Sequence, residues 1–283
     1  MTNTSPTLAQ ALNQAHTLGL ARIDAQLLLL HTLARHDAGR AWLLAHDTDA
    51  MEEAAHAQFI ALCQRRLAGE PVAYLTGRKE FYGLPLQVDA RVLDPRPDTE
   101  TLVDWALEVI APLTSPRVVD LGTGSGAIAL ALQSQRADAQ VLAVDASTDA
   151  LAVAQANAQR LGLPVQFQQA NWLAGVEGPF DAIVSNPPYI ASADPHLAAL
   201  THEPLQALAS GTDGLDDIRT IVAQAAAHLQ PGGWLLLEHG YDQAEAVQAL
   251  LATQGFALVQ SRNDLAGIAR CSGGQWPLAQ TVK

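Results

Sequence analysis

The sequence has 283 residues, of which 49% are hydrophobic, and this is enough for one large domain or for a large and a small domain. Its 16 basic and 29 acidic side chains give a net charge of -13, a sign that disfavours a protein that binds DNA or RNA mainly through phosphates. The two cysteines, Cys63 and Cys271, form no CxxC pair, so neither a disulfide framework nor a zinc site is expected.

The negative charge is concentrated in the C-terminal two-thirds of the chain. Residues 1–90 contain 7 basic and 9 acidic side chains, which leaves 9 basic and 20 acidic for the remainder. A solvated surface and a basic protein partner both explain this excess. Apolar runs such as Leu27 to Leu30 are far shorter than the ~20 residues of a membrane helix, and residues 1–10 lack a signal-peptide pattern. We therefore expect a cytoplasmic protein without membrane contact.

The first 70 residues predict a small helical bundle. Ser5-Pro6-Thr7 is typical of a helix start with proline in the first turn. Asp24 predicts the cap of a helix that reaches Leu33, and Asp49 the cap of a longer helix over 51–67. The residues expected on one side of that longer helix are Phe59, Leu62 and Cys63.

A connector over residues 71–90 follows the bundle. Aromatic and branched residues surround Gly83, so the segment 79–88 predicts a β-hairpin. Residues 94–100 then form a proline-stiffened loop, in which Asp98 or Thr99 can cap a helix over 102–110.

From Arg117 onward, short apolar strands alternate with helices, which predicts an α/β domain with a mostly parallel sheet and helices on both faces. The expected parallel strands lie at residues 118–121, 141–145, 165–168, 182–185 and 234–237. Two further strands, at 256–260 and 267–271, are separated by a short loop and predict an antiparallel hairpin at one edge of the sheet. We assign residues 91–283 to this domain.

A glycine-rich turn joins the first of these strands to the following helix. Its residues are Gly122, Thr123, Gly124, Ser125 and Gly126. Glycine allows a sharp turn and the close approach of a ligand to a helix N-terminus. Asp145 ends the next strand, roughly 20 residues on, where an acidic side chain can bind both ribose hydroxyls of an adenosine ligand.

The spacing of these glycines distinguishes between two cofactors. The turn reads Gly-Thr-Gly-Ser-Gly and lacks the Gly-x-Gly-x-x-Gly spacing that leaves room for a pyrophosphate. This favours S-adenosylmethionine, which has no phosphate, over a nicotinamide dinucleotide. A plain tight turn remains the alternative when the glycines are considered alone.

The tetrapeptide Asn186-Pro187-Pro188-Tyr189 directly follows the strand at 182–185, at the carboxyl edge of the sheet where open α/β folds bind ligands. An amide or nucleobase nitrogen is a poor nucleophile because its lone pair is delocalised. The Asn186 side-chain oxygen and the Pro187 carbonyl can accept hydrogen bonds from such an NH2 group and favour a pyramidal nitrogen. Tyr189 offers a flat face for the planar group. The pattern predicts an adenosylmethionine-dependent N-methyltransferase.

The sequence resembles the bacterial protein-(glutamine-N5) methyltransferases that modify peptide chain release factors, the PrmC or HemK family. The resemblance spans essentially the whole chain. Besides the glycine turn and the tetrapeptide, it rests on Gly69 to Gly77, Glu80-Phe81-Tyr82, Pro95 to Glu100, Asp194 to Leu197, Glu203-Pro204 and Leu237 to Gly240.

The resemblance implies a class I methyltransferase fold, Rossmann-like, with a seven-stranded sheet and a small N-terminal helical domain. We expect that near-neutral domain to dock the protein substrate, because a loop glutamine must be held by more than the tetrapeptide. It implies S-adenosylmethionine as cofactor, S-adenosylhomocysteine as product, and as substrate the glutamine of the Gly-Gly-Gln loop of class 1 release factors in translation termination. It places cofactor contacts on 122–126, Asp145, Asn171, Trp172 and Asn186. It places substrate contacts on 186–189, and no metal is implied.

Three features depart from the family or bear on it. Asn171 stands where the family usually has Asp, and Leu200-Thr201-His202 stands where Val-Arg-Phe is more usual. Gly273-Gly274-Gln275 copies the tripeptide that such an enzyme would modify, which we interpret as chance in the predicted edge hairpin, with automethylation as the alternative.

Two other functions remain open. A nucleic-acid N-methyltransferase acting on an exocyclic base amine would need the same planar NH2 grip, but the acidic charge and the presence of only two lysines disfavour direct nucleic-acid binding. A non-catalytic binding module that kept the fold is disfavoured by the intact tetrapeptide. His239 follows Glu238 after a strand and could line the cavity, without an assigned catalytic role.

Overall fold

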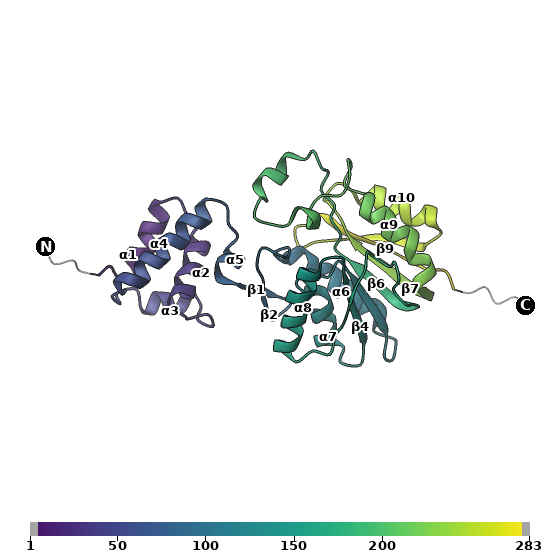
Figure 1. Cartoon of the computed structure of the whole chain (residues 1–283), viewed down its shortest axis with the longest axis horizontal. Helices are drawn as coiled ribbons and strands as arrows, with labels where there is room; N and C mark the ends of the chain where they lie inside the picture. Colours follow the sequence, from purple (N-terminus) through teal and green to yellow (C-terminus); the bar gives the residue numbers. More distant parts are fainter. Residues whose placement is uncertain (1–4, 279–283) are drawn as a thin grey trace, which may run out of the picture. The chain divides into compact units, whose positions relative to one another are not determined.

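The computed structural model describes residues 5–278 (Figure 1). The chain divides into two compact units, Met1–Arg78 and Lys79–Lys283.

From Ser5 to Arg78 the first unit contains five α-helices, as expected for a bundle. They are α1 (Leu8–Thr17), α2 (Arg22–Thr32), α3 (Arg40–Ala45), α4 (Glu53–Leu67) and α5 (Val72–Thr76). Apolar side chains from these helices form one core, in which Phe59 and Cys63 of α4 are fully buried and Leu62 nearly so. The apolar spacing of α4 therefore identified its buried side correctly.

The starts of these helices differ from the prediction. Pro6 precedes the helix, and Thr7 is the N-cap of α1, in a capping box with Gln10. Asp24 caps nothing: it lies in the first turn of α2, and its carboxylate binds the Arg66 guanidinium at 2.7 Å. Asp49 does not cap α4 either, since that helix begins at Glu53 with Glu52 as an N-cap that makes no side-chain bond.

The second unit is built on a seven-stranded sheet in the order β5-β4-β3-β6-β7-β9-β8, which confirms the α/β fold class. The strands are β3 (Arg117–Leu121), β4 (Gln140–Asp145), β5 (Gln166–Gln169), β6 (Phe180–Ser185), β7 (Leu229–Glu238), β8 (Ala257–Asn263) and β9 (Ala269–Gln275). Strands β3 to β7 pair in parallel, and β9 runs antiparallel to both β7 and β8. The edge hairpin is thus present, although its second strand starts and ends later than expected.

Two groups of helices cover the sheet, as Figure 1 shows for the second unit. Helices α6 (Glu100–Ile110), α7 (Ala127–Gln135) and α8 (Thr148–Leu161) pack on β3 to β7, and α9 (Asp216–Ala225) and α10 (Ala244–Gln254) pack on β7, β8 and β9. Short 3-10 helices lie at Pro97–Thr99, Pro195–Ala199, Leu205–Ala207 and Ala226–His228. Because β3 and β6 are covered on both faces, nearly all their residues are buried.

A two-stranded sheet of β1 (Arg78–Phe81) and β2 (Leu84–Gln87) forms the predicted hairpin around Gly83. Asn157 of α8 ties β2 to the large sheet's helices. Its side chain donates to the Gln87 carbonyl at 2.9 Å and accepts from the Gln87 amide at 2.7 Å.

The Gly-Gly-Gln tripeptide lies at the end of β9, between β7 and β8. A Cβ atom on Gly273 would stand 2.6 Å from Leu236 Cδ2 and 3.0 Å from the Trp105 ring, so glycine is needed there for packing. The Gln275 amide donates to the Gly232 carbonyl at 2.8 Å. The tripeptide is thus explained by the sheet itself.

Candidate functional site

The glycine turn and the tetrapeptide follow two neighbouring strands. In the β3–β6 pair Leu121 stands opposite Ser185, and the Ser185 hydroxyl donates to the Leu121 carbonyl at 2.7 Å. The chain leaves β3 toward β4 and β5 on one side, whereas β6 and β7 lie on the other side. The two loops therefore flank the point where the strand order reverses, which is where open α/β folds bind ligands.

The glycine turn has a backbone that only glycine adopts easily. Gly122, Gly124 and Gly126 have φ angles of 71°, 55° and 85°. A Cβ on Gly126 would meet Leu130 at 3.0 Å and Ala154 at 3.2 Å, whereas a Cβ on Gly124 would meet nothing within 4 Å. Gly126 thus permits close packing of α7 on α8, and Gly124 presents its backbone to an open space.

Asp145, at the end of β4, supports this turn. Its carboxylate accepts the Gly124 amide at 2.9 Å and the Ser147 amide at 2.8 Å. Burial raises the pKa of this carboxyl, and its backbone hydrogen bonds act in the opposite direction. Each carboxylate oxygen has a second lone pair, so the group can still accept two bonds from a ligand.

Asp120, near the end of β3, stabilises the glycine turn through side-chain hydrogen bonds. Its side chain is fully buried and accepts the Thr123 hydroxyl at 2.6 Å and the Ala129 amide at 3.2 Å. Burial raises the pKa of Asp120 to about 7. These bonds fix Thr123 in the turn and the first turn of α7.

Trp172 and Asn171 lie beyond β5. The Trp172 ring stands 3.2 Å from the position of a Cβ on Gly122, and its indole nitrogen donates to Asp217 of α9 at 3.1 Å. Trp172 has a φ of 53°, an uncommon conformation for a bulky residue. The aromatic ring is thus held between the glycine turn and α9.

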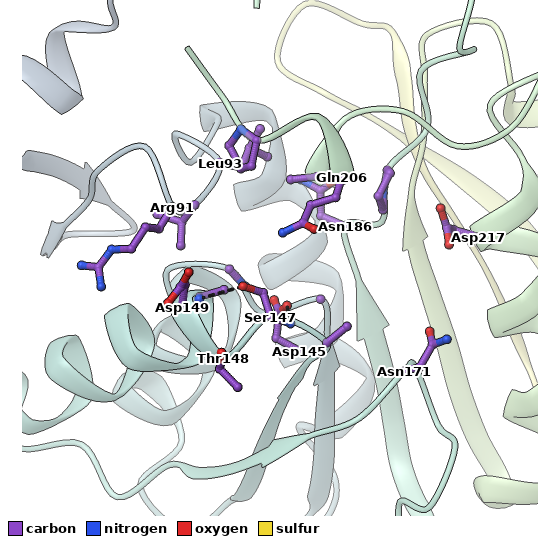
Figure 2. Close-up of a pocket in the computed structure, with 18 of the residues that line it drawn as sticks. Arg91, Leu93, Asp145, Ser147, Thr148, Asp149, Asn171, Asn186, Gln206 and Asp217 are labelled. Atoms are coloured by element: carbon purple, nitrogen blue, oxygen red, sulfur yellow. Dashed lines mark hydrogen bonds between the residues drawn. The ribbon is translucent and has the colours of Figure 1, made fainter. Parts of the chain in front are cut away.

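A cavity of about 540 Å³ opens above these segments. Figure 2 shows Asp145, Asn171 and Asn186 arranged around it, each from a different segment of the chain. Of the residues predicted to bind ligands, those that line this cavity are Gly122, Gly124, Asp145, Asn171, Trp172, Asn186 and Pro188. Thr123, Ser125, Gly126 and Pro187 do not line it, and Tyr189 lines a smaller cavity.

The tetrapeptide is held by residues from several elements. The Asn186 amide nitrogen donates to the Thr99 hydroxyl at 3.2 Å, and the Tyr189 hydroxyl donates to Glu238 at 3.5 Å. Gln243 donates to the Tyr189 carbonyl at 3.0 Å. Thr99 is the N-cap residue of α6, one of the two predicted candidates, but its side chain makes no capping bond. Its φ and ψ are helical, and its hydroxyl accepts the Asn186 amide instead.

A cavity of about 90 Å³ adjoins the tetrapeptide. Its lining includes Asn186, Tyr189, Leu93, Leu200 and Arg96. The Arg96 guanidinium binds Glu203 at 2.5 Å, and the Glu203 side chain is 3% exposed.

Glu203 also fixes the backbone of the proline-rich loop, because its carboxylate accepts the Asp94 amide at 3.2 Å. The proline-rich loop and the Glu-Pro segment, far apart in the sequence, therefore meet beside the tetrapeptide.

Three acidic or basic candidates lie elsewhere. His239 is fully buried and lines neither cavity; its ring contacts the Ser272 hydroxyl and the Gly240 carbonyl, each at 2.8 Å. Asp98 and Glu100 line neither cavity. Glu100 accepts the Tyr82 amide at 2.9 Å instead. The expectation that His239 could line the cavity was therefore wrong.

Sequence reasoning gave no site role to Thr99, Gln243 or Asp217, although each contacts a predicted site residue. Thr99 lies within the family motif Pro95 to Glu100, and that motif was the one sign in the sequence that it could belong to the site. Gln243 and Asp217 had none, because their contacts arise only when α9 and α10 fold onto the sheet.

The chain matches two family models, "PrmC N-terminal domain" over residues 7–77 and "Methyltransferase small domain" over residues 99–213. It is 48% identical to the release factor glutamine methyltransferase of Burkholderia pseudomallei, with 98% of this chain and 100% of the relative covered. It is 50% identical to that of Bordetella pertussis, over 90% and 95% of the two chains. The chain belongs to the release factor glutamine methyltransferase family. The resemblance inferred from the motifs is thereby confirmed.

The comparison with solved structures bears only on the fold of this chain. One similar structure is a Thermus thermophilus 16S rRNA N2 G1207 methyltransferase in complex with AdoMet and guanosine, with a TM-score of 0.53 and 21% identity. The alignment covers 70% of this chain and 49% of that one. It supports the class I methyltransferase fold.

Within residues 5–278 of this methyltransferase, no group of three or more His, Cys, Asp or Glu side chains could hold a metal ion. None of the described helices is long and apolar enough to cross a membrane. Cys63 and Cys271 are buried free thiols, as expected.

Proposed function

We propose that this chain transfers a methyl group from S-adenosylmethionine to the side-chain amide nitrogen of the glutamine in the Gly-Gly-Gln loop of class 1 release factors. The observation that supports this best is the position of Asn186. It lines both the large cavity and the smaller one beside it, so it stands where a cofactor and a substrate amide would meet.

The residues around the large cavity fit S-adenosylmethionine, whose part in the chemistry is to supply a methyl group activated on a sulfonium. Asp145 has lone pairs left for the two ribose hydroxyls, and Gly124 leaves its backbone open. Asn171 can accept a bond from the adenine amine through its side-chain oxygen. A volume of about 540 Å³ lies within the usual range of ligand sites.

Asn186 and Pro187 act on the substrate nitrogen. Because the Asn186 amide nitrogen is bound to Thr99, its oxygen is the atom left to accept a hydrogen bond from the glutamine NH2. The Pro187 carbonyl accepts a second bond. Two such bonds favour a pyramidal nitrogen whose lone pair points at the methyl group, and the nitrogen releases its proton after the transfer.

The side chain of Tyr189 flanks the smaller cavity and offers a flat face to the planar amide. Burial raises the pKa of this phenol, so its hydroxyl stays protonated and donates to Glu238. Tyr189 therefore positions the substrate and removes no proton.

We further propose that residues 1–70 dock the release factor, that 71–90 connect, and that 91–283 catalyse. A loop glutamine needs more contacts than four residues supply. Deleting residues 1–70 should raise the KM for release factor far more than that for adenosylmethionine. Equal effects on both would contradict this role. Because release factors act in translation, we propose the cytoplasm as the compartment.

The proposed function is tested by incubating the chain with labelled adenosylmethionine and either a release factor or RNA. We expect one methyl group on the glutamine of the Gly-Gly-Gln peptide, seen by fragmentation mass spectrometry. A release factor in which that glutamine is replaced by alanine serves as the control. Label on RNA alone would instead support the nucleic-acid methyltransferase.

A further inference from the structure

Arg96 is the one charged residue among the described residues that line the small cavity beside the tetrapeptide, and the mechanism above gives it no part. At about 90 Å³ this cavity is well below the ~300 Å³ of the smallest usual ligand sites, so it has room for a side chain and not for a cofactor. Apolar side chains form much of its wall, namely Leu93, Ile190, Leu200 and Leu208. A hydrogen bond made beside such a wall is stronger than one made in water.

Two carboxylates hold the Arg96 guanidinium in place. Glu203, whose side chain is 3% exposed, binds Nη2 at 2.5 Å, and one oxygen of Asp94 lies 3.6 Å from Nη1. The Glu203 carboxylate also accepts the Asp94 amide at 3.2 Å. Asp94 has a second cation, since Lys79 Nζ lies 3.1 Å from its other oxygen. The guanidinium is thus oriented by the protein itself before any substrate binds.

The same guanidinium keeps donors for a ligand. An arginine side chain has five N–H donors, and within residues 5–278 Arg96 makes one hydrogen bond with them, from Nη2 to Glu203. Asp94, at 3.6 Å, is an ion-pair partner beyond hydrogen-bond distance. Because the guanidinium is planar, its donors point outward in a fixed fork. With one edge on Glu203, Arg96 can therefore offer further N–H groups to a carbonyl oxygen at the small cavity.

The substrate of the proposed reaction has carbonyl oxygens of two kinds, and the chemistry distinguishes between them. One is the carboxamide oxygen of the glutamine. A cation on that oxygen would draw the nitrogen lone pair toward the carbonyl group, and so oppose the two bonds by which Asn186 and Pro187 localise it. The others are main-chain carbonyls. Glycine has no side chain, so a Gly-Gly segment can be recognised only through its main chain, which the lack of Cβ atoms also lets approach closely.

We propose that Arg96 is a specificity-determining residue: its guanidinium donates to a main-chain carbonyl of the Gly-Gly-Gln loop while the glutamine side chain enters the small cavity, and Glu203 positions Arg96 for this contact. The inference rests on the proposed function, since it takes that loop as the substrate. The contact lies outside the tetrapeptide and distinguishes a glutamine that follows glycine in a peptide from an isolated primary amide.

The kinetic test uses Arg96→Lys, which keeps a positive charge beside Glu203 but replaces the fork by a single ammonium group. Losing a hydrogen bond from a charged donor should raise the KM for release factor about 10- to 100-fold. The kcat and the Kd of adenosylmethionine should stay within about threefold, because the contact is made equally before and during methyl transfer. Arg219→Lys, the same change in an exposed ion pair with Asp213 on α9, should match the unaltered protein.

A second pair of variants separates recognition from a loss of structure. Arg96→Met combined with Glu203→Gln removes both charges, so no buried carboxylate is left unpaired. It should raise the KM for release factor as much as Arg96→Lys does. Glu203→Gln alone keeps an acceptor for Arg96 and should raise this KM less, by about 2- to 10-fold. A merely structural role would instead lower the urea midpoint and weaken adenosylmethionine binding together with the KM.

A binding experiment identifies the group that Arg96 contacts. The probes are a Gly-Gly-Gln peptide with blocked ends and propionamide, which has a carboxamide but no peptide main chain. Each is titrated into the S-adenosylhomocysteine complex and followed by NMR. Arg96→Lys should weaken peptide binding about 10- to 100-fold and leave propionamide binding unchanged. Equal losses for both probes would place the guanidinium on the carboxamide oxygen and overturn the inference, as would no loss for either.

The outcome for the inference is distinguishable from the outcome for the proposed function. If the unaltered chain methylates release factor and both Arg96 variants keep its KM, the inference is overturned and the proposed function stands. If the unaltered chain methylates no release factor, the proposed function is overturned and the inference with it. The first failure is observed only in the variants, and the second is already observed without them.

Discussion

The loop after β3 and the loop after β6 lie side by side at one edge of the sheet, yet they are held by different parts of the chain. The glycine turn is fixed by Asp120, Asp145 and Asn157, all within about one βαβ unit of it. The tetrapeptide is fixed by Thr99, 87 residues before Asn186, and by Gln243, 54 residues after Tyr189.

This difference separates what each loop needs. A cofactor common to many methyltransferases can be bound by a locally built turn that uses its own backbone. A substrate amide must be aligned with the methyl group, and that alignment depends on side chains brought in by α6, β7 and the start of α10. We therefore expect changes at the glycine turn to alter the Kd of adenosylmethionine and changes at the tetrapeptide to alter kcat.

The largest effect is expected from Asn186→Ala, which removes one acceptor that binds the substrate nitrogen. It should lower kcat by about 10²- to 10³-fold, as loss of one transition-state hydrogen bond does, and leave adenosylmethionine affinity within about threefold. Steady-state kinetics and calorimetric titration measure the two quantities. Asn263→Ala, at an exposed position of β8, is the control. A parallel loss of cofactor affinity would show that the two loops are not separable.

Asp145→Asn should change the Kd of adenosylmethionine, which Asn186→Ala leaves nearly unchanged. The new NH2 group would face either the Gly124 or the Ser147 amide, both of which donate to Asp145 now. Losing bonds to a charged acceptor costs about 1.5–3 kcal/mol, so the Kd of adenosylmethionine should rise by about 10- to 100-fold. Equilibrium binding checks this, with exposed Asp37→Asn as the control. Unchanged affinity with reduced kcat would reverse the assignment of the two loops.

Asp120 makes the stability of the fold depend on pH. Its folded pKa, about 7, lies above the ordinary value of 3.8, so the folded state binds the proton more tightly. The contribution of Asp120 to stability should therefore be fully present below about pH 4 and fall as the pH rises from about 4 to 7, by at most about 1.4 kcal/mol per pH unit. Glu238 contributes in the same direction.

Urea unfolding at several pH values between 5 and 8 measures this slope. Asp120→Asn, which cannot ionise, should make it shallower. The carboxyls whose pKa is lowered by ion pairs, such as Asp138 and Asp213, titrate well below this window. An unchanged slope would mean that Asp120 does not titrate there.

Asp217 offers a smaller test, because it is a long-range contact on the cofactor side. Asp217→Leu removes the acceptor of the Trp172 indole and should weaken adenosylmethionine binding about 2- to 10-fold. Asp217→Asn keeps an oxygen acceptor and should bind more tightly than the leucine variant. Equal binding by all three proteins would show that the glycine turn and Asp145 suffice.

The sequence predicted the elements that have a local pattern. Apolar strands and the glycine turn were found because their signals lie within a few residues. Helix starts were predicted less well. Asp24 was expected to cap a helix but pairs with Arg66. Thr99 is the N-cap residue of α6, as one of the two predicted candidates, but its hydroxyl binds Asn186 and not the helix backbone. Polar side chains that can cap a helix can equally bind a distant partner, and a single sequence does not reveal which they do.

The smallest effect is expected from a change in the Gly-Gly-Gln tripeptide of β9, which lies away from both loops of the site. Gln275 pairs with Trp234 in the middle of β7, whereas Cys271 pairs with Glu238 beside the tetrapeptide. Four residues of strand separate these positions by about 13 Å. Methylation of Gln275 would also require breaking its bond to Gly232 and opening strand pairs on both sides.

We therefore expect no methyl group on this chain after incubation with adenosylmethionine, measured as intact mass. Gln275→Ala should leave release-factor methylation unchanged and cost about 1 kcal/mol of stability or less, since one side-chain hydrogen bond is lost. A methylated tryptic peptide containing Gln275 would contradict this. A glutamine can enter the site only from a segment whose backbone is not hydrogen-bonded into a sheet. The Gly-Gly-Gln tripeptide of this chain is paired on both sides, so the same three residues that are a substrate in a loop are not one in β9.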